Sequence, residues 1–185
     1  TAASQTAERV YRALAGAAEV RNRLVLGAGA RLDWLPQETI LFDGGRLDRR
    51  LDVEMAEGAT LLAVEPLVLG RAAMGERVET GGLSDLWRIR RGGALLHAEA
   101  LRFEAPAAFS AAAGFAGNRA AATLLFVADG AERLLAPARA ALDAAKGALG
   151  GASAWGGRLV IRLVAEGGAQ LRAALLPLIS LCRPG

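Results

Sequence analysis

The chain has 185 residues, of which 53% are hydrophobic and 5% aromatic, and its formal net charge is +3. This length fits one domain with a sizeable core. The slight charge, without basic runs interleaved with aromatic residues, argues against a nucleic-acid-binding protein. The single cysteine, Cys182, rules out an internal disulfide, and no run of about 18 apolar residues marks a membrane span. We therefore expect a cytoplasmic protein that binds neither nucleic acid nor membrane.

Glycine turns divide the first hundred residues into three predicted strand–turn–strand units, at residues 19–35, 46–67 and 85–103. In the second unit, apolar residues alternate around Arg49, while charged residues such as Arg50 take the opposite face. A period of two is typical of a strand with one solvated side. Glycine provides the positive φ that tight hairpin turns require. The pattern thus predicts antiparallel hairpins.

A weak internal repeat relates the first two units. GARLDWLP at Gly29 and GATLLAVEP at Gly58 align with an offset of 29 residues, and a looser copy begins at Gly93. Repeated units of this size favour a mainly β fold of stacked antiparallel hairpins, either β-helix-like or an elongated sandwich. Two ordinary hairpins of similar composition are the alternative.

Two α-helices are predicted in the C-terminal half, at about 131–149 and 168–182. Apolar residues at helical spacing support the first helix, with Asp129 and Glu132 as a capping box and Gly150 near its end. The second helix is apolar nearly all round. We therefore expect it to be buried, either within this chain or against a partner.

Few residues in the sequence suit nucleophilic or metal chemistry. The single histidine, His97, and Cys182 are far apart and lack the spacing of metal ligands, which argues against a stable zinc or nickel site. The sequence has no nucleophile elbow, phosphate loop or dinucleotide glycine motif. His97 lies on a predicted strand, where a structural role is the simplest interpretation. We expect no tightly bound cofactor and no catalytic residue.

Polar residues interrupt two apolar runs, and they supply the candidate site. If the repeats stack, Glu38 and Glu65 come near the same edge of a sheet, and as buried acids they would need arginine partners. The plainer alternative is that these are solvated turn residues or braces of the fold. The candidate carboxylates are Glu38, Asp43, Glu65 and Glu76, and the candidate partner-binding or structural residues are Gln37, Arg46, Arg50 and Arg71.

Two central motifs resemble the urease accessory protein family UreD, called UreH in some bacteria. They are WLPQETILFDG from Trp34 and EPLVLGRAAMGE from Glu65, and they are accompanied in family order by QTAERVYRA at Gln5, RLDRRLDV at Arg46, GGLSDLWRIRRGG at Gly81 and WGGRLVIRL at Trp155. The similarity covers essentially the whole chain. It implies that residues 1–185 form a single UreD-like domain that lacks the family's N-terminal portion and short C-terminal tail.

The resemblance implies a non-enzymatic chaperone that bridges apo-urease to the accessory proteins UreF and UreG during nickel insertion. A homodimer within the accessory complex is compatible with it. The water-filled nickel passage suggested for the family would make Glu38, Asp43, Glu65 and Glu76 transient Ni²⁺ contacts. Carboxylates suit such a passage because they hold Ni²⁺ weakly enough to release it. The alternative is that these residues only brace the fold through arginine–carboxylate pairs.

Two other classes of function remain open at this point. A stacked-β carbohydrate-active enzyme would use Glu38 and Glu65 as its acid and base, although the chain offers few aromatic residues for stacking on sugars. A β-rich interaction module unrelated to urease is the second.

Overall fold

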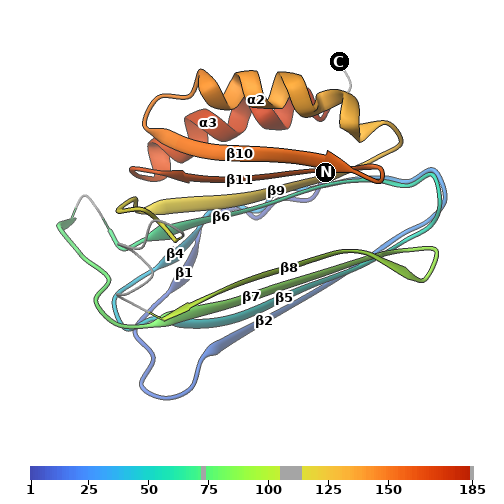
Figure 1. Cartoon of the computed structure of the whole chain (residues 1–185). Coiled ribbons are helices and arrows are strands. Elements are labelled where there is room, and N and C mark those ends of the chain that lie inside the picture. The colour runs from blue at the N-terminus through green and yellow to red at the C-terminus, as the bar shows by residue number, and fades with distance from the viewer. Residues whose placement is uncertain (72–73, 105–113, 184–185) are drawn as a thin grey trace.

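The computed structural model describes residues 1–71, 74–104 and 114–183. Two β-sheets and a layer of helices form three layers (Figure 1). The seven-stranded sheet is here called the helix-covered sheet, and the four-stranded sheet the open sheet. In chain order the elements are β1 (Glu8–Val10), β2 (Ala18–Leu26), β3 (Arg31–Trp34), β4 (Thr39–Leu41), β5 (Arg46–Met55), β6 (Thr60–Leu69), β7 (Gly82–Arg91), β8 (Ala94–Glu104), β9 (Ala120–Val127), the 3₁₀ turn η2 (Ala131–Leu134), α2 (Leu135–Asp143), β10 (Ala148–Trp155), β11 (Arg158–Ala165) and α3 (Gly168–Leu181).

The mainly β class and the helices in the C-terminal half are confirmed, and each of the three predicted units is strand–turn–strand. The predicted antiparallel pairing within the first two units is wrong. In both units the turn carries the chain from the open sheet to the helix-covered sheet, so that β2 pairs in parallel with β5, and β3 with β6. Of the three units, only the third is an antiparallel hairpin, formed by β7 and β8. We call a strand–turn–strand unit whose two strands lie in different sheets an arch. The arch of β2 and β3 stacks on the arch of β5 and β6, which gives the β-helix-like arrangement.

The internal repeat corresponds to the register of this stack. Ala18 pairs with Leu47, and Arg31 with Thr60, each pair 29 residues apart as in the sequence alignment. The third, looser copy does not stack. Its turn places Gly92 and Gly93 at φ 55° and 81°, a two-residue hairpin geometry that returns β8 along β7 in the same sheet.

The amide and carboxylate of the WLPQETIL segment lie in a break between two short strands. β3 pairs with residues 60–63 of β6 and β4 with residues 67–69, so residues 35–38 do not pair with β6. Pro66 of β6 lies opposite this break and has no backbone N–H to donate to a neighbouring strand. The break therefore follows from the sequence of the 35–38 segment and from the proline in the opposing strand β6.

Hydrophobic side chains fill both spaces between the layers. Leu159, Ile161 and Leu178 pack between the helices and the helix-covered sheet. Between the two sheets, Leu51 and Trp87 belong to a second cluster. The predicted alternation of β5 is confirmed, because every second residue of that strand is buried. The one charged residue of this inward row is Arg49.

The first predicted helix ends earlier than expected, because α2 stops at Asp143 and a strand follows. Gly150 lies within β10, where a Cβ would stand 2.8 Å from that of Leu163 and 2.9 Å from a methyl of Leu142. Glycine there allows α2 to pack closely on the strand. The predicted capping box is also wrong, since the carboxylate of Glu132 accepts the Gly157 N–H instead.

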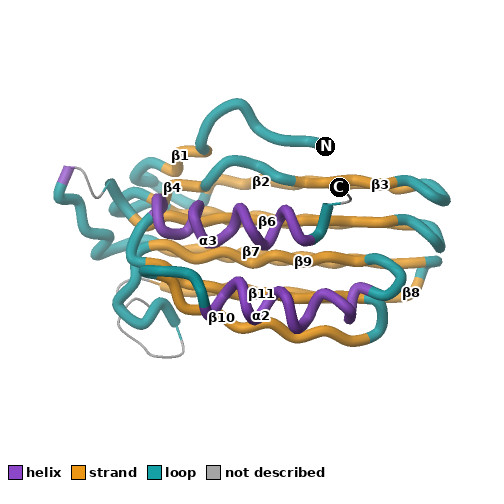
Figure 2. The backbone as a smooth tube through the Cα atoms, turned by 90° about the horizontal axis from the view of Figure 1, so that it is seen from above, coloured by secondary structure: helices purple, strands orange, loops and turns teal. Residues whose placement is uncertain are grey.

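The second predicted helix is confirmed as α3, which lies beside α2 over the helix-covered sheet (Figure 2). Its burial is one-sided: Leu171 and Leu178 are buried, whereas Leu176 is 52% exposed. Within the described ranges, no helix is long and apolar enough to cross a membrane.

Candidate functional site

A buried ionic cluster joins the two sheets. Arg49 of the open sheet reaches Glu65 of the helix-covered sheet, with 2.6 Å between Nη1 and Oε2. Its Nη2 lies 2.7 Å from Oδ2 of Asp85 on the neighbouring strand β7. Thr39 accepts a further hydrogen bond from Arg49, and the Trp34 indole N–H donates to Glu65 at 2.9 Å. All three charged residues are at most 5% exposed. We call Arg49, Glu65 and Asp85 the intersheet cluster.

The intersheet cluster is electrostatically uneven, because two carboxylates share one guanidinium. Burial raises the pKa of Glu65 to about 6, and the Arg49 charge and the Trp34 hydrogen bond offset only part of that effect. When both acids are ionised, the cluster carries one net negative charge. Near neutral pH it therefore has a modest attraction for a cation, and below about pH 6 it loses that attraction.

A cavity of about 420 Å³ lies beside this cluster between the sheets. Arg49, Glu65 and Asp85 line its polar part, and leucines and Phe115 line much of the rest. Arg162 of β11 also lines it and pairs with Glu99 of β8, which joins the sheets at this side. The cavity is mainly apolar and large enough for several waters, and the intersheet cluster supplies the acids that line it.

Asp43 and Glu76 form a separate cluster in the loops around β4. Asp43 Oδ1 accepts the backbone N–H groups of Glu79 and Thr80, both at 2.9 Å, and Oδ2 lies 2.6 Å from Arg12. These backbone hydrogen bonds are the main reason that the pKa of Asp43 is lowered. Glu76 accepts from the N–H and Nε of Arg71, and this pairing lowers the Glu76 pKa. The cluster thus has the geometry of a loop brace.

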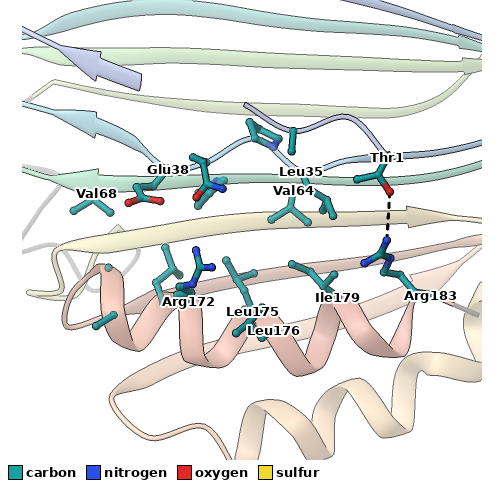
Figure 3. A pocket seen from close by; sticks show the side chains of 17 residues that line it. Thr1, Leu35, Glu38, Val64, Val68, Arg172, Leu175, Leu176, Ile179 and Arg183 are labelled. Carbon is teal, nitrogen blue, oxygen red and sulfur yellow. Dashed lines mark hydrogen bonds between the residues drawn. The ribbon is translucent and has the colours of Figure 1, made fainter. Parts of the chain in front are cut away.

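Gln37 and Glu38 line a mainly apolar groove between α3 and the break in the neighbouring strands (Figure 3). The groove has a volume of about 510 Å³. Glu38 lies on the strand side and Arg172 on the helix side, and no ion pair joins them. The backbone of Gln37 is fixed by its N–H, which donates to the Ser4 hydroxyl at 2.9 Å.

The structure therefore distributes the predicted residues over three places. Glu38 and Glu65 lie on opposite faces of the helix-covered sheet, one toward α3 and the other toward the open sheet, so the predicted juxtaposition of these acids is wrong. The same geometry removes the acid–base pair of the carbohydrate-active alternative. Arg46 pairs with Glu104, Arg71 with Glu76, and Arg50 lies on the outward face of β5.

Sequence reasoning missed Arg49 and Asp85, the other two members of the intersheet cluster. The sequence could have identified Arg49, because it is a charged residue in the apolar row of an alternating strand. Such a residue needs a buried counter-charge. No pattern in the sequence identifies Asp85 as the partner of Arg49, because its position beside Arg49 depends on the register of β5 and β7. Among the described residues, no group of three or more His, Cys, Asp and Glu side chains is arranged to hold a metal ion.

Comparison with known proteins agrees with the motifs in the sequence. A family model described as UreD urease accessory protein matches residues 1–185. The chain belongs to the UreD family. Its relatives include the urease accessory protein UreD of Rhizobium etli, which is 55% identical over 98% of this chain, and that of Agrobacterium fabrum, 47% identical over 98%. UreD of Xanthobacter autotrophicus is 52% identical over 89%.

The chain spans less than the full length of these relatives. It covers 66% of the Rhizobium etli protein, 63% of the Agrobacterium fabrum protein and 57% of the Xanthobacter autotrophicus protein. The UreD match places the chain with accessory proteins of urease.

Proposed function

We propose that this chain acts as a non-enzymatic scaffold in urease maturation, bridging apo-urease to UreF and UreG while nickel is inserted. The observation that carries the proposal is the UreD family match over residues 1–185. The structure supports a scaffold, because its charged interior residues are tied into a brace and its acids are not paired for catalysis. The cytoplasm is the compartment in which this role would be performed.

We further propose that nickel, as cargo, passes through the intersheet cavity. Glu65 is the predicted carboxylate that lines this cavity, and Asp85 adds a second oxygen donor. Two carboxylates beside a guanidinium would hold Ni²⁺ weakly, which suits transfer better than storage. The other three candidate carboxylates lie outside this cavity: Glu38 lines the groove beside α3, and Asp43 and Glu76 belong to the loops around β4.

Affinity capture tests the scaffold role. The tagged chain is co-expressed with the urease structural subunits, UreF and UreG, and the material that it retains is identified by mass spectrometry. We expect apo-urease and UreF to be retained together. Retention of neither, with the chain itself recovered folded, would contradict the proposal.

Nickel transfer is tested separately with Glu65→Gln. The amide keeps the shape of the side chain and leaves Arg49 paired with Asp85, so complex formation should persist while nickel loading of urease falls. Glu54→Gln, on the outward face of β5, is the matched control. Equal nickel loading in both variants would exclude Glu65 from the path without affecting the scaffold proposal.

A further inference from the structure

A row of polar side chains crosses the helix-covered sheet from the intersheet cluster toward the sheet's edge. Glu65 of β6 lies opposite Thr123 of β9, and Thr123 lies opposite Arg162 of β11. Residues directly opposite one another in antiparallel strands point to the same face of a sheet, so all three face the open sheet. All three also line the intersheet cavity. The cavity therefore extends sideways from the buried acids to β11, the neighbour of the edge strand β10.

The row ends at a glycine on that edge strand. Gly151 of β10 lies opposite Arg162, and within the described ranges a Cβ at Gly151 would have nothing within 4 Å. Leu149, on the same face of β10, lines the cavity and is 67% exposed. The corresponding edge of the open sheet is β8, whose Leu101 lines the same cavity. In the described part of the chain, the cavity thus reaches the surface between β8 and β10.

An ion pair spans this opening. Arg162 donates from Nε to Oε1 of Glu99 at 3.3 Å and from Nη2 to Oε2 of the same carboxylate. The Glu99 side chain is 12% exposed, and its Oε2 lies 3.7 Å from Nε2 of the buried His97 on the same strand. The Arg162 side chain is 59% exposed. The acid is therefore held against β8, whereas the arginine can swing into solvent.

The physics of such a pair allows it to open. An ion pair with a solvent-exposed partner is only slightly more stable than the separated ions. The arginine stem is long and flexible, so its rotation requires no change in the backbone. Once the pair is broken, the row of Thr123 and Glu65 is connected to solvent past Gly151, which has no side chain to obstruct it. Glu99 is then an unpaired carboxylate at the mouth, where it attracts a cation.

We propose that the space between β8 and β10 is a side entrance to the intersheet cavity, and that Arg162, paired with Glu99, is its gate. With the pair formed, the entrance is closed and its charges cancel. With Arg162 turned outward, a divalent cation meets Glu99 first and then Glu65 and Asp85. The proposal rests on the proposed passage of nickel only for the identity of what passes, and not for the opening itself.

Thiol labelling measures the opening without any metal. Thr123→Cys places a thiol within the polar row, and a small uncharged thiol reagent reports access to it. The chain without this change gives the background, because its only cysteine, Cys182, is 3% exposed. In the Thr123→Cys chain, Arg162→Ala should raise the labelling rate about fivefold. Gly151→Leu should lower the rate, because the leucine fills the mouth.

The matched control is Arg102→Ala, which removes the same charge from the exposed outward face of β8 and should leave the labelling rate unchanged. If Arg162→Ala does not fold, Glu99→Gln breaks the same pair from the other strand and should also raise the rate. Equal labelling with and without the ion pair would overturn the gate. Labelling that Gly151→Leu does not slow would overturn the position of the entrance.

Nickel loading separates this proposal from the proposed passage. Gly151→Leu, in the otherwise unchanged chain co-expressed with UreF, UreG and the urease subunits, should be retained with urease while the nickel content of urease falls. Slower labelling with full nickel content would contradict the passage of nickel through this cavity and would leave the entrance standing. Unchanged labelling would overturn the entrance alone.

Discussion

Arg49 and Glu65 form an ion pair across the two sheets, with 2.6 Å between Nη1 and Oε2. Each residue comes from a strand of a different sheet, and Asp85 shares the same guanidinium. This contact ties β5 to β6 across the space between the two sheets. It also explains why an otherwise apolar strand pair carries opposite charges in its inward rows.

Removing the arginine should be far more damaging than neutralising the acid. Arg49→Met leaves two buried carboxylates unpaired, which should cost about 3–5 kcal/mol in the free energy of unfolding. Glu65→Gln keeps Arg49 paired with Asp85 and should cost about 1 kcal/mol or less at neutral pH. Denaturant unfolding of both variants measures the difference. Equal destabilisation would show that Asp85 alone does not satisfy the guanidinium.

The raised pKa of Glu65 predicts a pH dependence of stability. The folded-state pKa is about 6, above its ordinary value of 4.5, so the folded protein binds this proton more tightly than the unfolded chain. The stabilisation is complete below pH 4.5 and is lost as the pH rises through 6. The shift corresponds to about 2 kcal/mol. Relative to the parent chain, Glu65→Gln should therefore gain about that much stability between pH 4.5 and 7. A difference that stays constant across this range would contradict the assignment.

The loops that hold Asp43 meet at two glycines, and this contact should tolerate no side chain. Gly81 has φ +113°, and a Cβ there would stand 2.2 Å from the carbonyl oxygen of Gly45. Gly81→Ala should destabilise the protein by about 1–3 kcal/mol. Gly151→Ala, where nothing lies within 4 Å of the added Cβ, is the control. Thermal unfolding of the two variants should differ by several degrees, and matching midpoints would mean that the loops move apart at little cost.

The half-exposed face of α3 should make the chain prone to association. Leu176→Glu changes a side chain that is 52% exposed, and we expect an unchanged unfolding midpoint with more monodisperse protein in light scattering. Leu178→Glu places a charge at a fully buried position and should prevent folding. If Leu176→Glu leaves aggregation unchanged, another surface of the molecule is responsible.

Local patterns in the sequence predicted the strands but not their partners. The alternation of β5 placed Arg49 in the inward row, and the 29-residue repeat is the register by which Ala18 meets Leu47. A glycine turn between alternating strands fits a hairpin and an arch equally well, because both need positive φ and one buried face. Pairing of β2 with β5, which are far apart in the sequence, selects the arch over the hairpin. The sequence of a single unit does not reveal this pairing.

Only part of the candidate site could be predicted, because it too depends on which strands pair. Glu65 is buried between the sheets as expected for an acid in an apolar run, yet its counter-charge is Arg49 and not Arg71. Glu38, like Glu65, follows the apolar run of its repeat, but it lies toward α3, because the break opposite Pro66 shifts the inward and outward positions of its strand. The pairing offset to β6 changes from 29 residues in β3 to 28 in β4, and a shift of one residue reverses which face a side chain takes.

Nickel bound per urease active site is the most direct measure of the central claim. Urease is purified from cells that lack their own UreD and express this chain with UreF, UreG and the structural subunits, and its nickel content is determined by elemental analysis. A scaffold for nickel insertion should raise nickel content and urease activity together above those of cells without the chain. Urease that remains nickel-free, although the folded chain is present and bound to it, would contradict this account.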